Sequence, residues 1–204
     1  MAVKIITVSR QFGSGGRTIG KKLAADLGFS YFDREIIDRI AGETGFSKEY
    51  IAANSEYAPG KSIFSYSFEA AGTPGVMNGM TTTDYLFSVQ RKKVIEIATT
   101  SKPCIIVGRC ADYILREFDD VLNVYIYADL DFRAKRVVAT YGESETKPEK
   151  RVTDKDKKRA ANYKHFTDRE WGKPSNYDIC LNSGRIGVER CAEIIEEIVR
   201  ASGS

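Results

Sequence analysis

The chain has 204 residues, of which 42% are hydrophobic and 29% are charged, and its formal net charge is +3. This length accommodates one α/β domain with a full hydrophobic core and leaves little room for a second domain. The small net charge argues against a nucleic-acid partner but allows a local basic cleft for a small anion. The sequence has no run of 18 apolar residues and no charged start before an apolar stretch. We therefore expect a soluble, cytoplasmic protein that does not bind membranes.

Alternating strand and helix signals along the chain predict a parallel sheet with helices on both faces. Five short apolar runs are the predicted strands, at residues 3–8, 29–32, 104–107, 122–127 and 177–181. Apolar residues at helical spacing predict helices over residues 18–27, 36–41 and 188–199. The last of these has the clearest apolar stripe, formed by Val188, Cys191, Ala192, Ile195, Ile198 and Val199.

Two segments do not follow this alternation. Residues 55–83 are rich in Gly, Pro, Ser, Thr and aromatic residues without a period, and a loop of that length is either functional or partly disordered. Residues 141–159 are dense in Lys, Arg, Asp and Glu, which predicts a solvated flap followed by a charged helix. The basic residues of this flap alternate with acidic ones, which again argues against nucleic-acid binding.

The cysteines and the single histidine do not indicate a metal site. No pair of cysteines has CxxC spacing and His165 is the only histidine, whereas zinc sites need clustered thiolates and imidazoles. We expect buried, reduced thiols at Cys104, Cys110, Cys180 and Cys191.

The first predicted strand runs directly into the glycine-rich segment SRQFGSGGRT at residues 9–18, which opens a helix. Glycines allow backbone N–H groups to turn inward around a phosphate, and a helix N-terminus adds unpaired donors and partial positive charge. The guanidinium of Arg17 can contact phosphate oxygens, and the hydroxyl of Thr18 can ligate Mg²⁺. We therefore predict a loop for the phosphates of ATP that consists of Gly13, Ser14, Gly15, Gly16, Arg17 and Thr18.

The match of this loop to the P-loop pattern GxxxxGK[ST] is partial. Gly16 and Thr18 fit, but Gln11 stands at the position of the first glycine and Arg17 replaces the lysine. Arginine keeps the charge, yet it is larger than lysine and presents a planar fork. A tight structural turn therefore stays open as an alternative.

A dinucleotide-binding loop is a second alternative. The glycines of the loop together with Gly20 loosely resemble a Rossmann fingerprint, and Asp33 lies near the distance expected for a ribose-binding carboxylate. A nicotinamide-dependent short-chain oxidoreductase would also need a Tyr-x-x-x-Lys pair late in the sheet. The one such spacing joins Tyr57 to Lys61, in the irregular segment and too early in the chain, so this alternative is disfavoured.

Four patches, spread over almost the whole chain, carry a family resemblance. They are the glycine-rich loop, YFD at residues 31–33 followed by Arg39, IVGRC at residues 106–110, and VYIYAD at residues 124–129 followed by RAKR at residues 133–136. In their order and spacing they resemble the cytidylate kinase-like family of P-loop nucleoside monophosphate kinases. The departures are Arg17, which stands for the usual lysine, and Cys110, which replaces the aspartate of a Gly-Arg-Asp element.

The resemblance implies a three-layer P-loop NTPase fold, in which helices flank a five-stranded parallel sheet. Residues 1–204 would form one kinase domain, with a small acceptor-binding insertion at about residues 45–90 and a lid at about residues 137–160. The implied reaction is ATP-dependent, Mg²⁺-assisted phosphoryl transfer to a nucleoside monophosphate, with CMP and dCMP as the expected acceptors. Because the acceptor phosphate is itself a nucleophile at neutral pH, no catalytic base is expected.

The same resemblance assigns roles to charged residues inside and outside the loop. The positions that match acceptor-binding residues are Asp33, Arg39 and Arg109. The expected catalytic residues, which stabilise charge on the transferring phosphoryl group, are Arg17, Arg136 and Arg159. Lys164 resembles a further basic residue that closes over the phosphate, and Thr18 is the expected ligand of Mg²⁺.

Simpler structural roles stay open for several of these residues. Asp33 can instead cap the helix that follows it, and Arg39 and Arg159 can be solvent-facing helix residues. One member of the pair Arg133 and Arg136, which have helical spacing, can serve only to solvate a helix face.

Two functional alternatives are also open. A regulatory module would keep nucleotide affinity without turnover, and a related kinase would use an acceptor outside the nucleotides. Tyr163 and Trp171 can stack a base, although packing in the core or the lid is the favoured interpretation. A homodimer would be expected if residues 55–83 order only against a partner chain.

Overall fold

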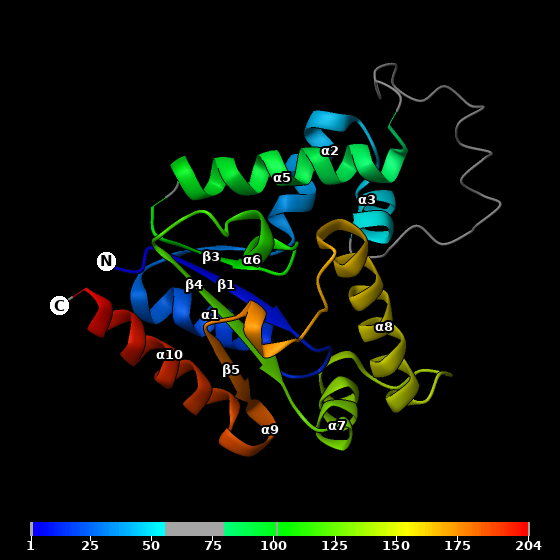
Figure 1. Ribbon diagram of the computed structural model, residues 1–204. Coiled ribbons are helices and arrows are strands. Elements are labelled where there is room, and N and C mark those ends of the chain that lie inside the picture. Colours follow the sequence, from blue (N-terminus) through cyan, green and yellow to red (C-terminus); the bar gives the residue numbers. More distant parts are fainter. Residues whose placement is uncertain (1, 56–79, 101, 204) are drawn as a thin grey trace.

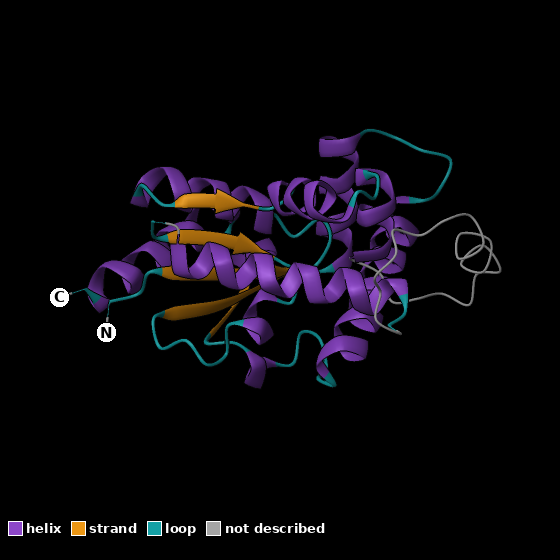
Figure 2. Cartoon of the chain, turned by 90° about the horizontal axis from the view of Figure 1, so that it is seen from above, coloured by secondary structure: helices purple, strands orange, loops and turns teal. Residues whose placement is uncertain are grey.

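The computed structural model describes residues 2–55, 80–100 and 102–203 (Figure 1). Five parallel strands form one sheet in the order β2-β3-β1-β4-β5. The strands are β1 (Ile5–Arg10), β2 (Ser30–Phe32), β3 (Cys104–Val107), β4 (Val121–Tyr127) and β5 (Ile179–Asn182). Helices lie on both sides of this sheet (Figure 2), so the predicted three-layer α/β fold is confirmed.

The helices form three groups around the sheet (Figure 1). One face is covered by α1 (Gly16–Leu27) and α10 (Val188–Ser202). The opposite face is covered by α2 (Glu35–Thr44), α5 (Thr82–Thr100) and α6 (Ala111–Ile114), and α3 (Lys48–Ser55) packs against α2 and α5. The third group follows β4 and comprises α7 (Leu130–Tyr141) and α8 (Pro148–Thr167). Two short elements flank β5, the 3₁₀ turn Pro174–Asn176 and α9 (Ser183–Ile186).

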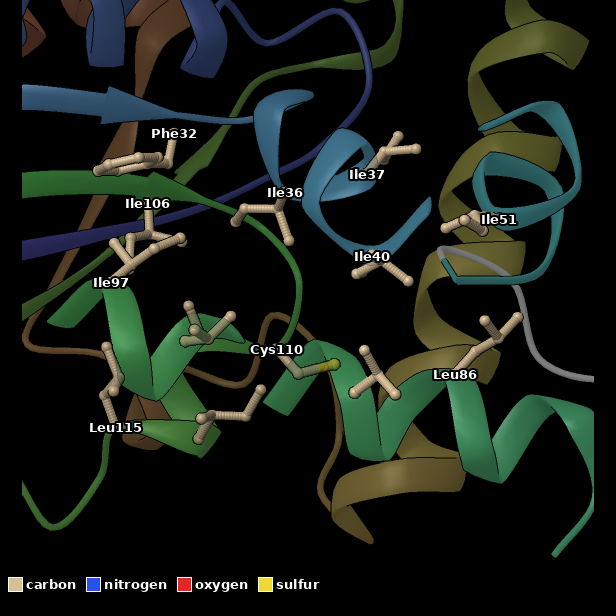
Figure 3. Packing of buried hydrophobic residues seen from close by; sticks show 14 of the residues in the cluster. Phe32, Ile36, Ile37, Ile40, Ile51, Leu86, Ile97, Ile106, Cys110 and Leu115 are labelled. Carbon is tan, nitrogen blue, oxygen red and sulfur yellow. The ribbon is translucent and has the colours of Figure 1, made fainter. Parts of the chain in front are cut away.

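Two hydrophobic clusters hold these layers together. In β1, Ile5 belongs to the cluster under α2 and α5, whereas Ile6 and Val8 belong to the cluster under α1 and α10. This alternation follows from the two-residue period of a strand. Figure 3 shows the first cluster, in which Ile36 and Ile40 of α2 lie among the apolar side chains of β3 and α5. Because both faces of the sheet are buried, its strands appear in the sequence as continuous apolar runs.

Most predicted element boundaries differ from the observed ones by a few residues. β1 begins and ends two residues later than predicted, because Ser9 and Arg10 continue the ladder opposite Tyr125 and Ile126 of β4. The charged stretch after α7 contains an irregular connection followed by α8, as predicted. Of the irregular segment at 55–83, residues 56–79 lie outside the described residues, and so do Tyr57 and Lys61.

Two predictions about burial need correction. Ile198 of α10 is 39% exposed, because the buried stripe of this helix runs through its neighbour Val199 and not through Ile198. Cys180 is only partly buried, whereas the other three cysteines are buried, and all four thiols are free. Burial raises the pKa of the Cys104 thiol to about 11.

No helix among the described residues combines the length and the apolar character that a membrane crossing requires.

The strand order places the centre of the sheet where a binding site is expected. β1 lies between β3 and β4, and the chain leaves its C-terminal end through the glycine-rich loop into α1. In parallel α/β sheets, ligands bind beyond the carboxyl ends of the strands where the strand order reverses. Here that position lies beyond the end of β1, facing α7 and α8 (Figure 1).

Candidate active site

The glycine-rich loop connects β1 to α1 and depends on its glycines. Gly13 and Gly15 have φ angles of +82° and +84°, in the left-handed region that favours glycine. A Cβ atom on Gly13 would lie 2.6 Å from the carbonyl oxygen of Arg133, and one on Gly16 would lie 2.6 Å from Cβ of Arg10. The backbone of the loop can therefore take this path only with glycine at these positions.

Gln11 explains how the loop holds its shape without the first glycine of the P-loop pattern. Its backbone N–H donates to the carbonyl of Ile126, and its side-chain Oε1 accepts from the N–H of Ala128 at 3.1 Å. Ser14 is also structural, because it is fully buried and its hydroxyl donates to the Gln11 carbonyl at 2.9 Å. The hydroxyl of Ser183, which follows β5, donates to the Ser14 carbonyl at 2.6 Å.

A cleft lies between the loop and the α7–α8 pair. Its lining residues are Arg10, Gln11, Phe12, Gly13, Gly15, Gly16, Arg17, Thr18, Arg136, Thr140, Tyr141 and Arg159. Four arginines and no carboxylate belong to this lining, so the cleft attracts anions. The structure thus brings together all of the predicted loop residues except the buried Ser14, and adds Arg136 and Arg159 from the opposite side.

Arg136 and Arg159 reach the loop from α7 and α8. Nη2 of Arg136 donates to Oγ1 of Thr18 at 2.8 Å. Nη1 of Arg159 donates to the carbonyl of Arg10 at 3.2 Å, and its side chain is only 10% exposed. The alternative that Arg159 merely solvates a helix is therefore wrong. The alternative that Arg133 or Arg136 serves only for solvation is wrong too, because Arg133 is buried and its Nε donates to the Ala128 carbonyl at 2.8 Å.

Asp156 fixes α8 beside the loop. Its Oδ1 accepts from the backbone N–H of Phe12 at 2.8 Å, and its other oxygen accepts from Arg133. Burial raises the pKa of Asp156, while these hydrogen bonds and the nearby Arg159 oppose that rise. One carboxylate therefore connects α7, α8 and the loop.

Asp33 is the counter-ion of two arginines and does not cap a helix. Its Oδ2 lies 2.7 Å from Nε of Arg17, and its Oδ1 lies 3.8 Å from Nη2 of Arg10. α2 has Arg34 at its N-cap position and no side-chain capping hydrogen bond, so the capping alternative for Asp33 is wrong. The ion pair directs the guanidinium of Arg17 toward the end of β2, where Asp33 lies.

Arg10, the last residue of β1, is a functional residue that the sequence motifs do not indicate. Arg10 is 6% exposed, and its guanidinium lies directly against Gly108, where an added Cβ atom would collide with it. The side chain thus extends from the loop toward the segment after β3. A charged residue at the end of an otherwise apolar strand is the signal that could have indicated it.

A second pocket adjoins the first and shares Arg10 and Arg159 with it. Its lining residues are Ser9, Arg10, Gly108, Arg109, Cys110, Arg159, Asn162, Tyr163 and Trp171. Arg109 and Cys110 have φ angles of 62° and 53°, which are uncommon for residues other than glycine and occur often at functional sites. Nε2 of Gln90 donates to the Arg109 carbonyl at 3.1 Å and helps to hold this turn.

The structure does not bring two of the predicted basic residues to either pocket. Arg39 is exposed on α2, with its guanidinium 5.3 Å from the centre of the Phe32 ring. Lys164 is exposed on α8 and pairs with Asp168 at 2.6 Å. Neither residue belongs to the lining of the two pockets.

The aromatic residues of the second pocket are held by packing, as predicted. Tyr163 is 3% exposed, and its hydroxyl donates to Oδ2 of Asp112 at 2.6 Å. Ser9 donates to the other oxygen of Asp112 at 3.4 Å. Burial raises the pKa of both Asp112 and Tyr163. Trp171 packs edge-on against Tyr125, with ring centres 5.6 Å apart.

Known proteins match this chain over nearly its full length. A protein-family model described as the cytidylate kinase-like family matches residues 5–185. The curated cytidylate kinase of Archaeoglobus fulgidus is 25% identical, over 95% of this chain and 93% of its own length. The cytidylate kinase of Methanococcoides burtonii is also 25% identical, over 98% of this chain and 99% of its own length.

Solved structures share the fold. The crystal structure of an uncharacterized protein from Eubacterium ventriosum superposes with a TM-score of 0.71 at 23% identity, covering 96% of this chain and 98% of that one. The shikimate kinase of Acinetobacter baumannii superposes with a TM-score of 0.52 at 15% identity, covering 98% of this chain and 94% of that one. At these identities the likeness concerns the fold alone.

Proposed function

Because the chain belongs to the cytidylate kinase-like family, we propose that it transfers the γ-phosphoryl group of ATP to a nucleoside monophosphate, giving ADP and the diphosphate. The proposed acceptors are CMP and dCMP, the acceptors expected from the sequence. One observation carries the assignment. Arg10 and Arg159 line both adjoining pockets, so the same guanidinium groups can face a donor phosphate and an acceptor phosphate. In-line transfer requires this close approach of two anions.

We assign the cleft at the glycine-rich loop to ATP. The backbone of Gly13, Gly15 and Gly16, together with the N-terminus of α1, supplies N–H donors for the phosphates. Arg17 adds positive charge at the position of the usual lysine. Ser14 supports the loop from beneath, because its side chain is buried.

Thr18 fits the role of a Mg²⁺ ligand. Its hydroxyl oxygen accepts from Arg136 and so faces the cleft. Mg²⁺ commonly takes one or two protein ligands beside substrate phosphates and water, and when bound with ATP it neutralises phosphate charge. Thr18 would hold the ion through this hydroxyl, and Arg136, which lines the same cleft, would bind phosphate oxygens.

We assign the second pocket to the acceptor. Arg109 lies at the carboxyl end of β3, and Arg10 lies beside it against Gly108, so both can bind the acceptor phosphate. Asp33 acts through its ion pairs with Arg10 and Arg17, and therefore positions these arginines. Arg39 lies outside both pockets, and this arrangement gives no support for its predicted contact with the acceptor.

The proposed reaction is tested by measuring ADP production from Mg·ATP with CMP, dCMP, UMP, AMP, GMP or dTMP and without an acceptor. We expect acceptor-dependent ADP with CMP and dCMP. If the protein binds ATP but none of these acceptors stimulates turnover, the nucleotide acceptor is wrong, and a regulatory module or another acceptor class is favoured. Failure to bind ATP would contradict the assignment of the phosphate loop.

A further inference from the structure

Asn162 contributes a buried hydrogen-bond acceptor to the second pocket. The residue lies on α8 and is 5% exposed. Its side-chain oxygen Oδ1 has no hydrogen-bond partner among the described residues. A buried carbonyl oxygen without a partner destabilises a folded protein, and native structures retain few of them. This oxygen therefore points to a ligand that supplies the missing donor.

The lining of the pocket indicates the chemistry of that ligand. Arg10, Arg109 and Arg159 favour an anionic group such as a phosphate. Tyr163 and Trp171 are held by packing, but they also line the pocket beside the amide of Asn162, and an aromatic wall of this kind favours a flat ring. A molecule that satisfies both parts carries a phosphate and a planar ring with an N–H donor at its edge.

Resting on the proposed function, we propose that Asn162 is a specificity-determining residue whose Oδ1 accepts a hydrogen bond from an amino group of the acceptor base. Cytosine carries an amino group at the position where uracil carries a carbonyl oxygen. A carbonyl facing Oδ1 would place two acceptors together, so the same atom favours CMP and disfavours UMP.

The position of Asn162 suits this role because residues before and after it on α8 are bonded to the rest of the protein. Tyr163, the next residue, is anchored to Asp112, and Asp156 is anchored to the N–H of Phe12. A side chain selects among ligands only when the backbone that carries it is fixed relative to the site. α8 is fixed here to the segment after β3 and to the phosphate loop.

The test compares wild type with Asn162→Leu, which has a similar volume but no hydrogen-bond acceptor. We expect kcat/KM for CMP to fall about tenfold or more, and kcat/KM for UMP to stay unchanged or rise. The loss should appear mainly in KM, because a contact to the base is equally strong in the ground state and the transition state. The preference for CMP over UMP should therefore fall by about the same factor.

Thermal unfolding separates this role from a structural one. Removing a buried oxygen without a partner should keep or raise the unfolding midpoint of Asn162→Leu, whereas loss of a structural hydrogen bond would lower it. Thr167→Val is the matched control, because Thr167 is buried on the same helix, bonds the Tyr163 carbonyl at 2.6 Å and does not line the pocket. It should lower the midpoint and leave the CMP/UMP preference unchanged. If Asn162→Leu does not fold, Asn162→Ala replaces it, because alanine also lacks a side-chain acceptor, and the same loss of preference is expected.

The outcomes distinguish the inference from the proposed function. An unchanged CMP/UMP preference in the Asn162 variant, with an active wild type that prefers CMP, would overturn the inference and leave the kinase assignment standing. A wild type that phosphorylates UMP as well as CMP would also overturn it. A wild type that uses no nucleoside monophosphate would overturn both.

Discussion

Arg159 brings positive charge from α8 to the place where the two pockets adjoin. Its Nη1 donates to the carbonyl of Arg10, and its guanidinium lies 5.8 Å from the centre of the Phe12 ring. A donor held in this way needs little reorganisation when charge develops on a transferring phosphoryl group. Such a donor lowers the barrier by about 3 kcal/mol. Substitution of Arg159 therefore tests directly whether charge stabilisation contributes to catalysis in this site.

We predict that Arg159→Ala lowers kcat about a hundredfold. The fold should persist, because Asp156 and Tyr163 still attach α8 to the rest of the protein. Steady-state ADP production with the preferred acceptor measures the effect. Lys158→Ala is the control, since Lys158 is the exposed neighbour on the same helix and lines neither pocket. Full turnover in Arg159→Ala would show that Arg159 does not act from the lid to stabilise charge on the transferring phosphoryl group.

The sequence predicts residues whose role depends on their neighbours in the chain. It does not predict residues whose role depends on side chains that are distant in sequence and close in space. The glycines of the loop can be found because a phosphate-binding turn needs them at fixed spacing. The pairing of Asp33 with Arg17 and Arg10 cannot be found in this way, because it depends on how β2 lies beside α1 in space. Asn162 is missed for the same reason, since its neighbours give no sign that its oxygen lacks a partner.

The element that the sequence describes least completely is α8. Its many charged residues correctly predict a charged helix, but they also suggest that all sides of this helix are exposed to solvent. In the structure, one side of α8 is held by buried polar contacts, through Asp156 to the loop and through Tyr163 to Asp112. A helix that packs through polar groups shows no apolar stripe, so periodicity cannot reveal its buried face.

Asp112, which joins α6 to α8, should make stability depend on pH. Burial raises its pKa above the ordinary value of 3.8, although the hydrogen bonds from Tyr163 and Ser9 oppose this. A carboxyl whose pKa is raised by folding binds more protons in the folded state than in the unfolded state between the two pKa values. Its contribution to stability therefore falls as pH rises from 3.8 through the folded pKa.

We predict that Asp112→Asn removes this penalty while keeping an acceptor for the Tyr163 hydroxyl. The free energy of unfolding of the variant minus that of wild type should increase as pH rises from about 4 to about 8, because only the wild type loses stability over this range. Urea unfolding at several pH values measures this difference, with Asp26→Asn as an exposed control on α1. A difference that does not change with pH would contradict the raised pKa of Asp112.

At the scale of the molecule, the fold is the part that the sequence predicts best. The strands β1 and β3 are buried throughout, so they stand out as apolar runs, and the alternation of strands with helices then predicts a parallel sheet. The acceptor-binding insertion at about residues 45–90 stays a prediction, because residues 56–79 lie outside the described residues. The lid at about residues 137–160 also stays a prediction, and it has a direct consequence for dynamics.

If α7 and α8 form a lid, binding of both substrates should tighten the first half of α8 more than the rest of the fold. In this half, Val152 is the buried apolar residue and Asp156 is the link to the loop. Bound phosphates would add contacts to Arg136 and Arg159 across the cleft. We therefore predict slower hydrogen–deuterium exchange in residues 142–158 when a non-hydrolysable ATP analogue and CMP are added together. Peptides from α10 serve as the control and should not change. Protection of residues 11–18 without any change in 142–158 would show that the substrates bind without closing a lid.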